Sequence, residues 1–470
     1  MESIVVALDA PEAADPKRFG PKAANLAALG RAGLPVPGGY AVDADAYRIQ
    51  LAALGLSETA REVFAAEDRP RARRCALDMK LGLMEKPIAP QLLEPLLAAW
   101  RQVTASGARG VVRSSALVED RADSSFAGQF ESFLELQDEG EFLVAVRACW
   151  AALWSTRALR YMATHDLDPA DTAMALVVQP LVAARVSGGG LSRTAEGEMV
   201  VNAAPGLGSA IAQGEVAPDR YVLDRAGSLK ESALGRKYHG IGCIHGRKTL
   251  SRSLAGSRCL DDEQVAELGL LMRRSEAVIG GPVEIEWALD DAGIKMLQAR
   301  PLRVAQERVP DDIWLQHPRL EGHPSGIGWA SGRARVVNCE CELERVAPGD
   351  VLVTTVAGPA LGPALAHVAG VVAELGGSTS HLASLARERG VPMVLGVLDA
   401  TRRIPDGATV AVDGVAGVVA ELGGSTSHLA SLARERGIPM VLGVLDATRQ
   451  IPDGSQVAVD GVAGIVRWIR

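Results

Sequence analysis

The 470-residue sequence has no long apolar run, no basic leader and no excess of positive charge. No stretch reaches the ~18 consecutive apolar residues of a membrane-spanning helix. The first twenty residues begin with a short apolar run that Asp9, Pro11 and Glu12 soon interrupt, which is not the pattern of a secretory signal. These absences predict a cytoplasmic protein without a membrane partner.

The charge balance and the cysteines exclude further classes. The formal net charge is −8, and a nucleic-acid backbone repels such a chain, so general nucleic-acid binding is not expected. Small anionic ligands need only local positive pockets. The six cysteines are scattered, and Cys339 with Cys341 forms C-x-C without a second pair. Reduced, buried thiols are therefore expected rather than a metal site.

What the sequence does contain is the composition of an ordinary globular protein, 48% hydrophobic and 23% charged, with a length that suits roughly two to four domains. Over the first 300 residues, short β-rich runs alternate with longer helical patterns, which predicts an α/β or α+β fold. The β-rich runs are 3–8, 111–116, 173–182 and 283–289, and the helical patterns are 41–66, 142–164 and 262–278. A polar stretch with several prolines follows from residue 306 and predicts a linker.

The C-terminal part contains an internal repeat. The string AGVVAELGGSTSHLASLARERG occupies residues 369–390 and occurs again, letter for letter, at 416–437. His381 and His428 mark the period, which is 428 − 381 = 47 residues. A solenoid needs about three or more units to build a continuous core, so a tandem duplication is the simpler interpretation.

The repeated string puts a histidine at the start of a predicted helix. A short apolar run predicts a buried strand, two glycines permit a sharp turn, and Ser378, Thr379 and Ser380 are helix-capping residue types. HLASLARER has helical spacing, and Gly390 can end the helix. The field of a helix N-terminus favours anions and disfavours imidazolium, so His381 is predicted to be neutral and nucleophilic toward phosphorus. A capping or core histidine is the alternative.

This string resembles the phosphohistidine motif of the swivelling domain in the phosphoenolpyruvate-utilising family, which includes phosphoenolpyruvate synthase, pyruvate phosphate dikinase and rifampicin phosphotransferase. Residues 347–374 resemble the first half of that domain, and the first 305 residues resemble the family's ATP-grasp domain. The resemblance implies the following organisation: an ATP-grasp domain over 1–305, a linker over 306–323, and a swivelling β/α phosphohistidine domain over 324–470, with a complete copy at 324–417 and a duplicated half at 418–470.

Three segments carry the resemblance in the nucleotide half. Residues 19–42, FGPKAANLAALGRAGLPVPGGYAV, put Lys22 in a glycine-flanked turn before a helix, where a lysine can reach phosphate oxygens. Residues 111–136 put Arg113 after a strand-like run, and an arginine fork suits triphosphate oxygens. The same segment resembles the family's phosphate-covering loop, formed here by Ser124, Ser125, Gly128 and Gln129. In the third, LVVQPLV, the resemblance implies that Gln179 and the backbone near Val182 contact adenine.

A metal site is predicted in VEIEWALDDAGIKMLQARPL, residues 283–302. Two adjacent strands would bring Glu286 and Gln298 together, with Arg300 beside them. A carboxylate and an amide oxygen suit Mg²⁺, and an arginine can offset charge on a transferring phosphoryl group. Because side chains alternate along V-E-I-E-W, both glutamates share one face, and an exposed strand carboxylate is the alternative for Glu286. ATP and Mg²⁺ are the expected cofactors.

The sequence departs from the family pattern at two places near the expected nucleotide site. Ser209 stands in GLGS where the family has an acidic residue, and GGGLSRTAEG at 188–197 replaces a phenylalanine-threonine segment. Altered or weakened use of nucleotide is therefore an open alternative. A degenerate nucleotide-binding scaffold would follow from it. An ATP-grasp ligase is a further alternative, although it leaves the histidine motif without a role.

The resemblance implies an ATP-dependent phosphotransferase of the pyruvate, water dikinase type, which forms a phosphohistidine and passes the phosphoryl group on. The acceptor is expected to be a small molecule or a separate acceptor-domain protein, because no large acceptor domain is recognised up to Arg470. His381 is the expected carrier, because use of His428 would loop out 47 residues at a cost of roughly 2–4 kcal/mol. The extra segment is expected to pack on the domain or to mediate self-association.

Overall fold

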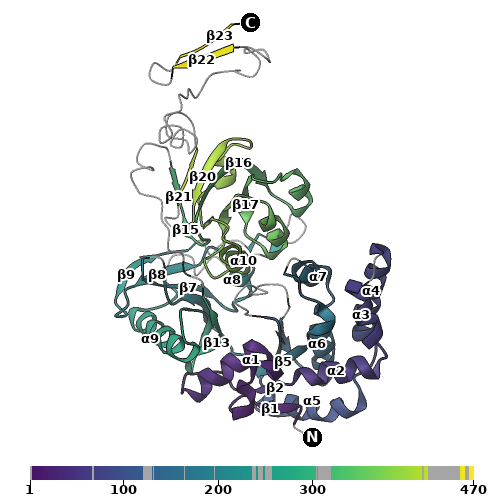
Figure 1. The fold of residues 1–470 in the computed structure, drawn as a ribbon. Coiled ribbons are helices and arrows are strands. Elements are labelled where there is room, and N and C mark those ends of the chain that lie inside the picture. The colour runs from purple at the N-terminus through teal and green to yellow at the C-terminus, as the bar shows by residue number, and fades with distance from the viewer. Residues whose placement is uncertain are drawn as a thin grey trace. The chain divides into compact units, whose positions relative to one another are not determined.

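The chain forms two compact units in the computed structural model. The first unit holds Met1–Ala305 together with Gly376–Glu388, and the second holds Gln306–Leu375 and Arg389–Arg470. The structure describes residues 3–65, 68–119, 130, 132–163, 165–194, 196–235, 240–241, 247–248, 257–302, 304, 319–414, 418–421, 456–460 and 465–469. The mixture of helices and sheets agrees with the predicted fold class (Figure 1).

The first unit contains an antiparallel five-stranded sheet in the order β1-β2-β5-β3-β4. Its strands are β1 (Val5–Ala7), β2 (Tyr40–Val42), β5 (Met174–Pro180), β3 (Gly110–Ala116) and β4 (Ser132–Leu136). The accompanying helices are α1 (Pro16–Arg31), α2 (Ala44–Ala53), α3 (Ser57–Ala65), α4 (Arg69–Glu85), α5 (Pro90–Val103), α6 (Glu139–Ala152) and α7 (Thr156–Ala163), with short 3₁₀ helices η1 (Pro11–Ala14) and η2 (Pro169–Asp171).

The same unit contains an antiparallel six-stranded sheet in the order β13-β12-β6-β7-β8-β9. Its strands are β13 (Gly293–Pro301), β12 (Val283–Asp290), β6 (Val186–Leu191), β7 (Met199–Pro205), β8 (Asp219–Leu223) and β9 (Leu229–Ala233). The remaining elements are α8 (Ser209–Ala212), α9 (Asp262–Ile279) and the two-stranded ribbon of β10 (Gly240–Ile241) and β11 (Arg247–Lys248).

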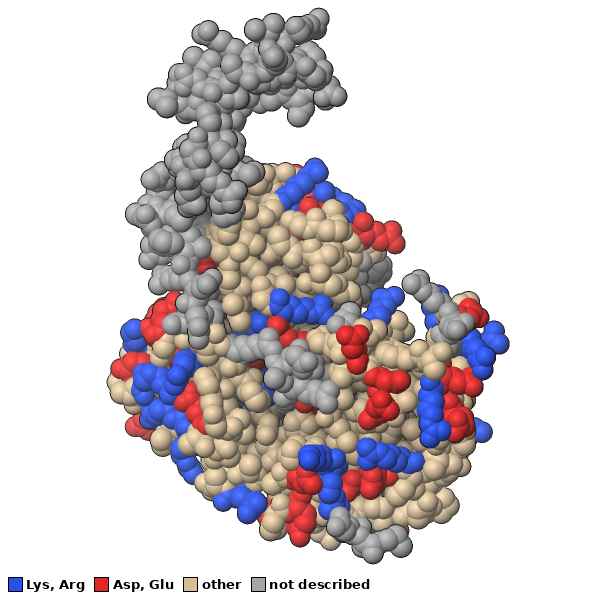
Figure 2. Space-filling model, in the orientation of Figure 1, with Lys and Arg blue, Asp and Glu red and all other residues tan. Residues whose placement is uncertain are grey.

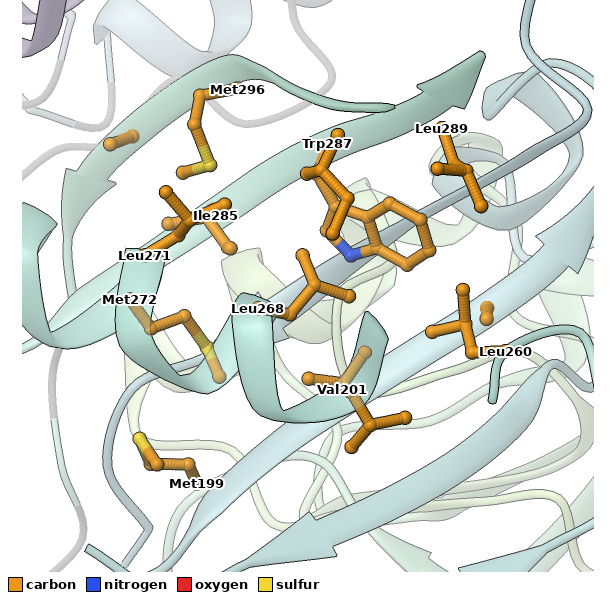
Figure 3. Close-up of a cluster of buried hydrophobic side chains, with 14 of the residues drawn as sticks. Met199, Val201, Leu260, Leu268, Leu271, Met272, Ile285, Trp287, Leu289 and Met296 are labelled. Atoms are coloured by element: carbon orange, nitrogen blue, oxygen red, sulfur yellow. The ribbon is translucent and has the colours of Figure 1, made fainter. Parts of the chain in front are cut away.

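Helix α9 determines which face of the six-stranded sheet is buried in the core. The helix begins with a capping box between Asp261 and Gln264, and it ends at Gly280, whose left-handed backbone suits glycine. Its apolar side chains pack with Ile285 and Trp287 of β12 in one cluster (Figure 3). Because side chains alternate along a strand, Glu284 and Glu286 of β12 lie on the opposite face of the sheet.

The second unit contains an eight-stranded sheet in the order β14-β21-β20-β16-β17-β18-β19-β15, in which β16, β17, β18 and β19 pair in parallel. The strands are β14 (Arg319–Glu321), β21 (Val418–Glu421), β20 (Thr409–Asp413), β16 (Trp329–Val337), β17 (Val351–Val356), β18 (Gly370–Leu375), β19 (Met393–Leu395) and β15 (His323–Pro324). The helices of this unit are η5 (Glu340–Arg345), η6 (Pro359–Ala366) and α11 (Ala400–Arg403), whereas α10 (His381–Arg389) belongs to the first unit up to Glu388. A separate hairpin joins β22 (Gln456–Asp460) and β23 (Ile465–Ile469).

Several sequence predictions differ from the structure in detail. The helical pattern at 41–66 begins within strand β2, and Gly55, with a positive φ, separates α2 from α3. The part of the expected linker that the structure describes, residues 319–323, contributes to strands β14 and β15, because Arg319–Glu321 pairs with β21. The thiols are also not all buried: Cys75 and Cys149 are buried, whereas Cys341 is exposed.

One helical stretch, Glu139–Ala163, is long and apolar enough to cross a membrane by length and composition alone. Half of its most apolar window is buried inside the protein. Within it Phe142, Val146 and Trp150 are fully buried, which is the pattern of a core helix in a folded domain. On the face seen in Figure 2, Lys and Arg side chains are interspersed with Asp and Glu and form no single basic surface.

Candidate functional site

His381 is the first residue of helix α10, as the sequence predicted. Strand β18 ends at Leu375, and Gly376, with a φ of 118°, begins the turn that leads into the helix. The Ser380 hydroxyl accepts a hydrogen bond from the backbone N–H of Ala383 at 3.3 Å, which is the contact of an N-cap serine. The predicted capping by a serine is therefore confirmed for Ser380.

The ring of His381 is held in its neutral form. Burial, and then the positive charges of Arg300 and Lys22, lower its pKa from 6.5 to about 4, although Glu286 and Glu284 act in the opposite direction. The main cause is thus the removal of the ring from water rather than the helix field that the sequence suggested. A neutral imidazole keeps a nitrogen lone pair at pH 7, which is the requirement for a nucleophile.

A buried ionic network holds the helix of His381 against strand β12. The carboxylate of Glu284 accepts hydrogen bonds from the Ser384 hydroxyl at 3.0 Å and from the Arg387 guanidinium at 2.7 Å. Arg300 lies 3.2 Å from the same carboxylate. Burial acts to raise the pKa of Glu284, but the two arginines keep it below the ordinary value, so the carboxylate is ionised. Buried charges persist when they are paired in this way.

Sequence reasoning missed Glu284, Ser384 and Arg387 as site residues. A signal was present, because alternation along V-E-I-E-W had already placed Glu284 on the same face as Glu286. The spacing of Ser384 and Arg387, three residues apart on one helix, is a second signal. The partners of these residues, however, lie 100 and 103 positions away in the chain.

A row of four residues crosses the six-stranded sheet beneath the histidine segment, by which we mean Gly376–Glu388. Gln298, Glu286, Gly189 and Asn202 are cross-strand partners on β13, β12, β6 and β7. The Asn202 amide donates to the Ser378 hydroxyl at 2.9 Å. A Cβ atom at Gly189 would lie 2.6 Å from Cβ of Thr379, so only glycine permits this approach. The glycine-rich string that looked degenerate in the sequence is therefore a strand that makes room for the histidine segment.

The predicted metal pair is assembled, and an arginine contacts both of its oxygens. Nη2 of Arg113 lies 2.7 Å from Oε2 of Glu286 and 3.0 Å from Oε1 of Gln298. The two oxygens therefore converge on one point, and a carboxylate with an amide oxygen is a donor set that fits Mg²⁺. Burial acts to raise the pKa of Glu286, but Arg113 and Arg300 contribute to lowering it below its usual value.

Lys22 lies at the predicted glycine-flanked turn. Gly20 has a φ of 71° and interrupts α1, and a Cβ there would lie 2.3 Å from the carbonyl oxygen of Ser115. The Lys22 ammonium donates to the backbone carbonyl of Ser114 at 3.0 Å and pairs with Glu119 at 2.9 Å. The turn thus brings the lysine to strand β3, which also carries Arg113.

The remaining residues that the sequence predicted for the site make no described contact with His381, Glu286 or Arg113. The Gln179 side chain is buried and donates to the carbonyl of Gly38 at 2.8 Å, so its amide stabilises the fold, and Val182 is partly buried. Ser209 begins the short helix α8. Ser124, Ser125, Gly128, Gln129 and His428 lie outside the described residues. Their predicted roles stay predictions.

The assembled group combines a neutral nucleophile with paired cations and carboxylates. Lys22, Arg300, Glu284 and Glu286 all act on the electrostatics of His381. Among the described residues, no cluster of three or more His, Cys, Asp or Glu could hold a metal by itself. This composition suits a phosphorylated substrate, whose oxygens would complete the coordination of a cation at Glu286 and Gln298.

Comparison with known proteins matches both parts of the chain to domain families. Residues 16–317 match the pyruvate phosphate dikinase AMP/ATP-binding domain. Residues 346–417 and 413–464 both match the mobile domain of PEP-utilising enzymes. The matched domains define a class of proteins in which an AMP/ATP-binding domain is combined with a mobile domain. The chain belongs to the phosphoenolpyruvate synthase and pyruvate phosphate dikinase family, whose nucleotide is ATP.

Relatives that align with most of this chain are named phosphoenolpyruvate synthase or probable phosphoenolpyruvate synthase. The chain is 32% identical over 410 residues to a probable phosphoenolpyruvate synthase of Methanothermobacter thermautotrophicus, and 34% identical over 415 residues to one of Archaeoglobus fulgidus. It is 30% identical over 433 residues to phosphoenolpyruvate synthase of Escherichia coli. These alignments cover 84–85% of this chain but 55–60% of the relatives, so the chain spans little more than half of their length.

Proposed function

We propose that this chain transfers a phosphoryl group from ATP to His381 and passes it to a separate acceptor, as a phosphotransferase of the pyruvate, water dikinase type. The observation that carries the proposal is the neutral imidazole of His381 at a helix N-terminus, close enough to Lys22 and Arg300 for both charges to lower its pKa. A ring nitrogen with a free lone pair, next to cations that can hold phosphate oxygens, is the arrangement that phosphoryl transfer needs.

The ATP-grasp architecture that the family resemblance implies gives each predicted residue a role. Lys22, Arg113 and Arg300 bind and neutralise phosphate oxygens, and the loop with Ser124, Ser125, Gly128 and Gln129 covers them. The backbone around Gln179 and Val182 faces the adenine. Glu286 and Gln298 would hold Mg²⁺, which would supply positive charge to offset that of the phosphate oxygens.

The covalent step forms one bond and breaks one. The lone pair of an imidazole nitrogen of His381 attacks the β-phosphorus, a P–N bond forms, and the P–O bond that joins the β-phosphorus to AMP breaks, with its electron pair going to the departing oxygen of AMP. The γ-phosphoryl group is then transferred to water or phosphate, which leaves the β-phosphoryl group on the histidine. Arg300, held by Glu284 and Ser384, stabilises the charge that shifts during the transfer. In synthase-type relatives the β-phosphoryl group reaches the histidine, and we expect the same here.

Delivery requires the histidine segment to leave the nucleotide unit. Gly376 and Gly377 begin the segment and Gly390 lies just after it, so glycines, which restrict the backbone least, lie at both of its ends. The repeated string at 416–437 supplies a second candidate carrier, His428. His381 is the favoured carrier, because the described residues 319–414 with β21 already form an entire sheet.

The acceptor is a small molecule or a separate acceptor-domain protein. The proposal also includes a cytoplasmic location and no nucleic-acid partner. It further includes self-association of the chain through the second copy. Water or phosphate would accept the other phosphoryl group. A nucleotide-binding scaffold, to which the Ser209 departure points, predicts binding of ATP without phosphorylation.

Phosphohistidine formation tests the proposal. The full chain with Mg²⁺ is incubated with ATP labelled at the β or the γ position, and protein-bound label that is acid-labile and base-stable is counted. We expect label from the β position in the wild type and none in His381→Ala. Absence of label under conditions where calorimetry shows ATP binding would contradict the proposal and favour the scaffold.

A further inference from the structure

Arg113 contacts the two oxygens that were predicted to bind a metal. One guanidinium nitrogen, Nη2, donates to Glu286 at 2.7 Å and to Gln298 at 3.0 Å, while Nη1 donates to the carbonyl of Leu297 at 2.6 Å. Glu286 and Gln298 are direct cross-strand partners, so both oxygens project from one point of the sheet. The arginine therefore lies where a cation shared by these oxygens would lie.

Arg113 and a divalent cation are incompatible ligands of this pair. A bound Mg²⁺ would sit ~2.1 Å from each oxygen, and the lone pairs that face Nη2 would then face the metal. A guanidinium kept at hydrogen-bond distance from both oxygens would also lie within a few ångströms of a doubly positive ion, and water would screen this repulsion only in part, because the Glu286 side chain is 37% exposed and that of Arg113 less. The side chain of Arg113 is 14% exposed.

We infer that Arg113 and the metal exclude one another at Glu286 and Gln298, so that the metal binds this pair well only when phosphate oxygens draw Arg113 away. Phosphate is a strong alternative acceptor for the guanidinium fork. The metal and the nucleotide then bind together, and the protein alone binds the metal weakly. The inference rests on the proposed nucleotide site.

Lys22, the second cation proposed to bind phosphate, is likewise held by a carboxylate of the chain. It pairs with Glu119, whose side chain is 3% exposed, at 2.9 Å. All three cations that are proposed to bind phosphate are therefore paired with carboxylates of the chain itself: Lys22 with Glu119, Arg113 with Glu286, and Arg300 with Glu284. An incoming triphosphate exchanges these partners rather than entering a site with free charges, and only the exchange at Arg113 liberates metal ligands.

The test measures metal binding without nucleotide. Binding of Mn²⁺ to the full chain is followed by the loss of its free-ion electron paramagnetic resonance signal, in the wild type and in Arg113→Met. We expect the affinity for Mn²⁺ to increase about tenfold or more in Arg113→Met, which corresponds to roughly 1.4 kcal/mol or more. ATP binding should fall in the same variant, so one substitution moves the two affinities in opposite directions.

Matched variants locate the effect. Arg225→Met removes an arginine from another ion pair of the same unit, with Glu276, and should leave Mn²⁺ affinity unchanged. Arg113→Lys keeps a positive charge and should bind Mn²⁺ nearly as weakly as the wild type. The double variant Arg113→Met with Glu286→Gln should lose the gain. Arg113→Gln provides the same comparison if the Met variant does not fold, as judged by its thermal unfolding.

Two results would overturn the inference. One is an Mn²⁺ affinity in Arg113→Met that equals or falls below that of the wild type. The other is a gain that persists in the double variant, because the metal would then bind elsewhere. Neither result depends on catalysis: failure of phosphohistidine formation with the Mn²⁺ effect intact would contradict the proposed function and leave the exclusion standing.

Discussion

The segments Val371–Glu374 and Val418–Glu421 share the sequence Val-Val-Ala-Glu and lie in one sheet, but they pair differently. The first is part of β18, parallel to β17 and β19, and the second is β21, antiparallel to β20 and β14. The equivalent residues Val372 and Val419 are both buried in the same core cluster. The shared residues thus form a strand in both copies and bury the second valine in each, whereas the direction of pairing comes from elsewhere.

The preceding connection accounts for the difference. Between β17 and β18 the chain crosses back through the 3₁₀ helix η6, which permits parallel pairing. Between β20 and β21 only residues 414–417 intervene, and so short a turn produces an antiparallel hairpin. The hairpin of β22 and β23 repeats this pattern: Asp413 pairs with Val418, and Asp460 with Ile465, each 47 positions later.

The largest difference between the two copies is expected in the level of phosphohistidine when each histidine is replaced in turn. His381→Ala should abolish phosphohistidine, and His428→Ala should leave the wild-type level, because the segment of His381 belongs to the first unit together with Lys22 and Arg300. Mass spectrometry can locate the label without substitutions, since the tryptic peptides that end at Arg387 and Arg434 begin at Val346 and Ile404. Label at His428 in the wild type would show that the copies exchange.

Arginine substitutions give the next largest effect. Arg387→Met should lower the opening free energy of residues 376–388 by roughly 3 kcal/mol, because it removes a partner from the buried carboxylate of Glu284. Arg434→Met is the matched control in the second copy, and we expect its effect to stay within about 0.5 kcal/mol. Hydrogen exchange of peptides that extend to Val391 or Ile438 separates the two copies. If the two substitutions had equal effects, the prediction that only the first copy supplies the segment that packs with Glu284 would be wrong.

The predictable part of the site is local in sequence. Serine caps before His381, the glycine turn at Lys22, and the hairpin that pairs Glu286 with Gln298 each involve residues within about a dozen positions of one another. Local patterns of this kind also predicted β3, β5, β12 and α9 to within about two residues. Propensity, capping and alternation suffice for them.

The rest depends on packing between distant segments. The contact of Arg113 with Glu286 joins positions 173 residues apart, and no pattern within either segment announces it. The low pKa of His381 was predicted in its direction but assigned to the helix field, because burial of the ring depends on elements far away in the sequence. The close approach of Thr379 to Gly189 likewise appears only when both strands and the loop are in place.

The pH dependence of segment opening should distinguish the copies further. His381 has a pKa of about 4 when packed, against 6.5 when free, so below pH 6.5 protons bind preferentially to the opened segment. The opening free energy of residues 376–388 should therefore be constant above pH 6.5 and fall between about pH 6.5 and 4, by at most about 3 kcal/mol. His381→Gln should remove this slope and retain the part due to Glu284 and Glu286, whose lowered pKa values place their contribution at more acidic pH.

Removal of one repeat unit should have the smallest effect. Deletion of residues 416–462 joins Val415 to Ala463, so that Ile465–Ile469 follows β20 in the register that β22 and β23 already use. Val466 then takes the core position of Val419. An unfavourable change is Arg467 opposite Arg319, where Ala420 was, and like charges across a strand pair cost roughly 0.2–1 kcal/mol. We expect the unfolding free energy to change by no more than about 1 kcal/mol and phosphohistidine at His381 to persist. A loss of several kcal/mol in denaturant unfolding, not recovered by Arg467→Ala, would show that the second copy is an integral part of the fold.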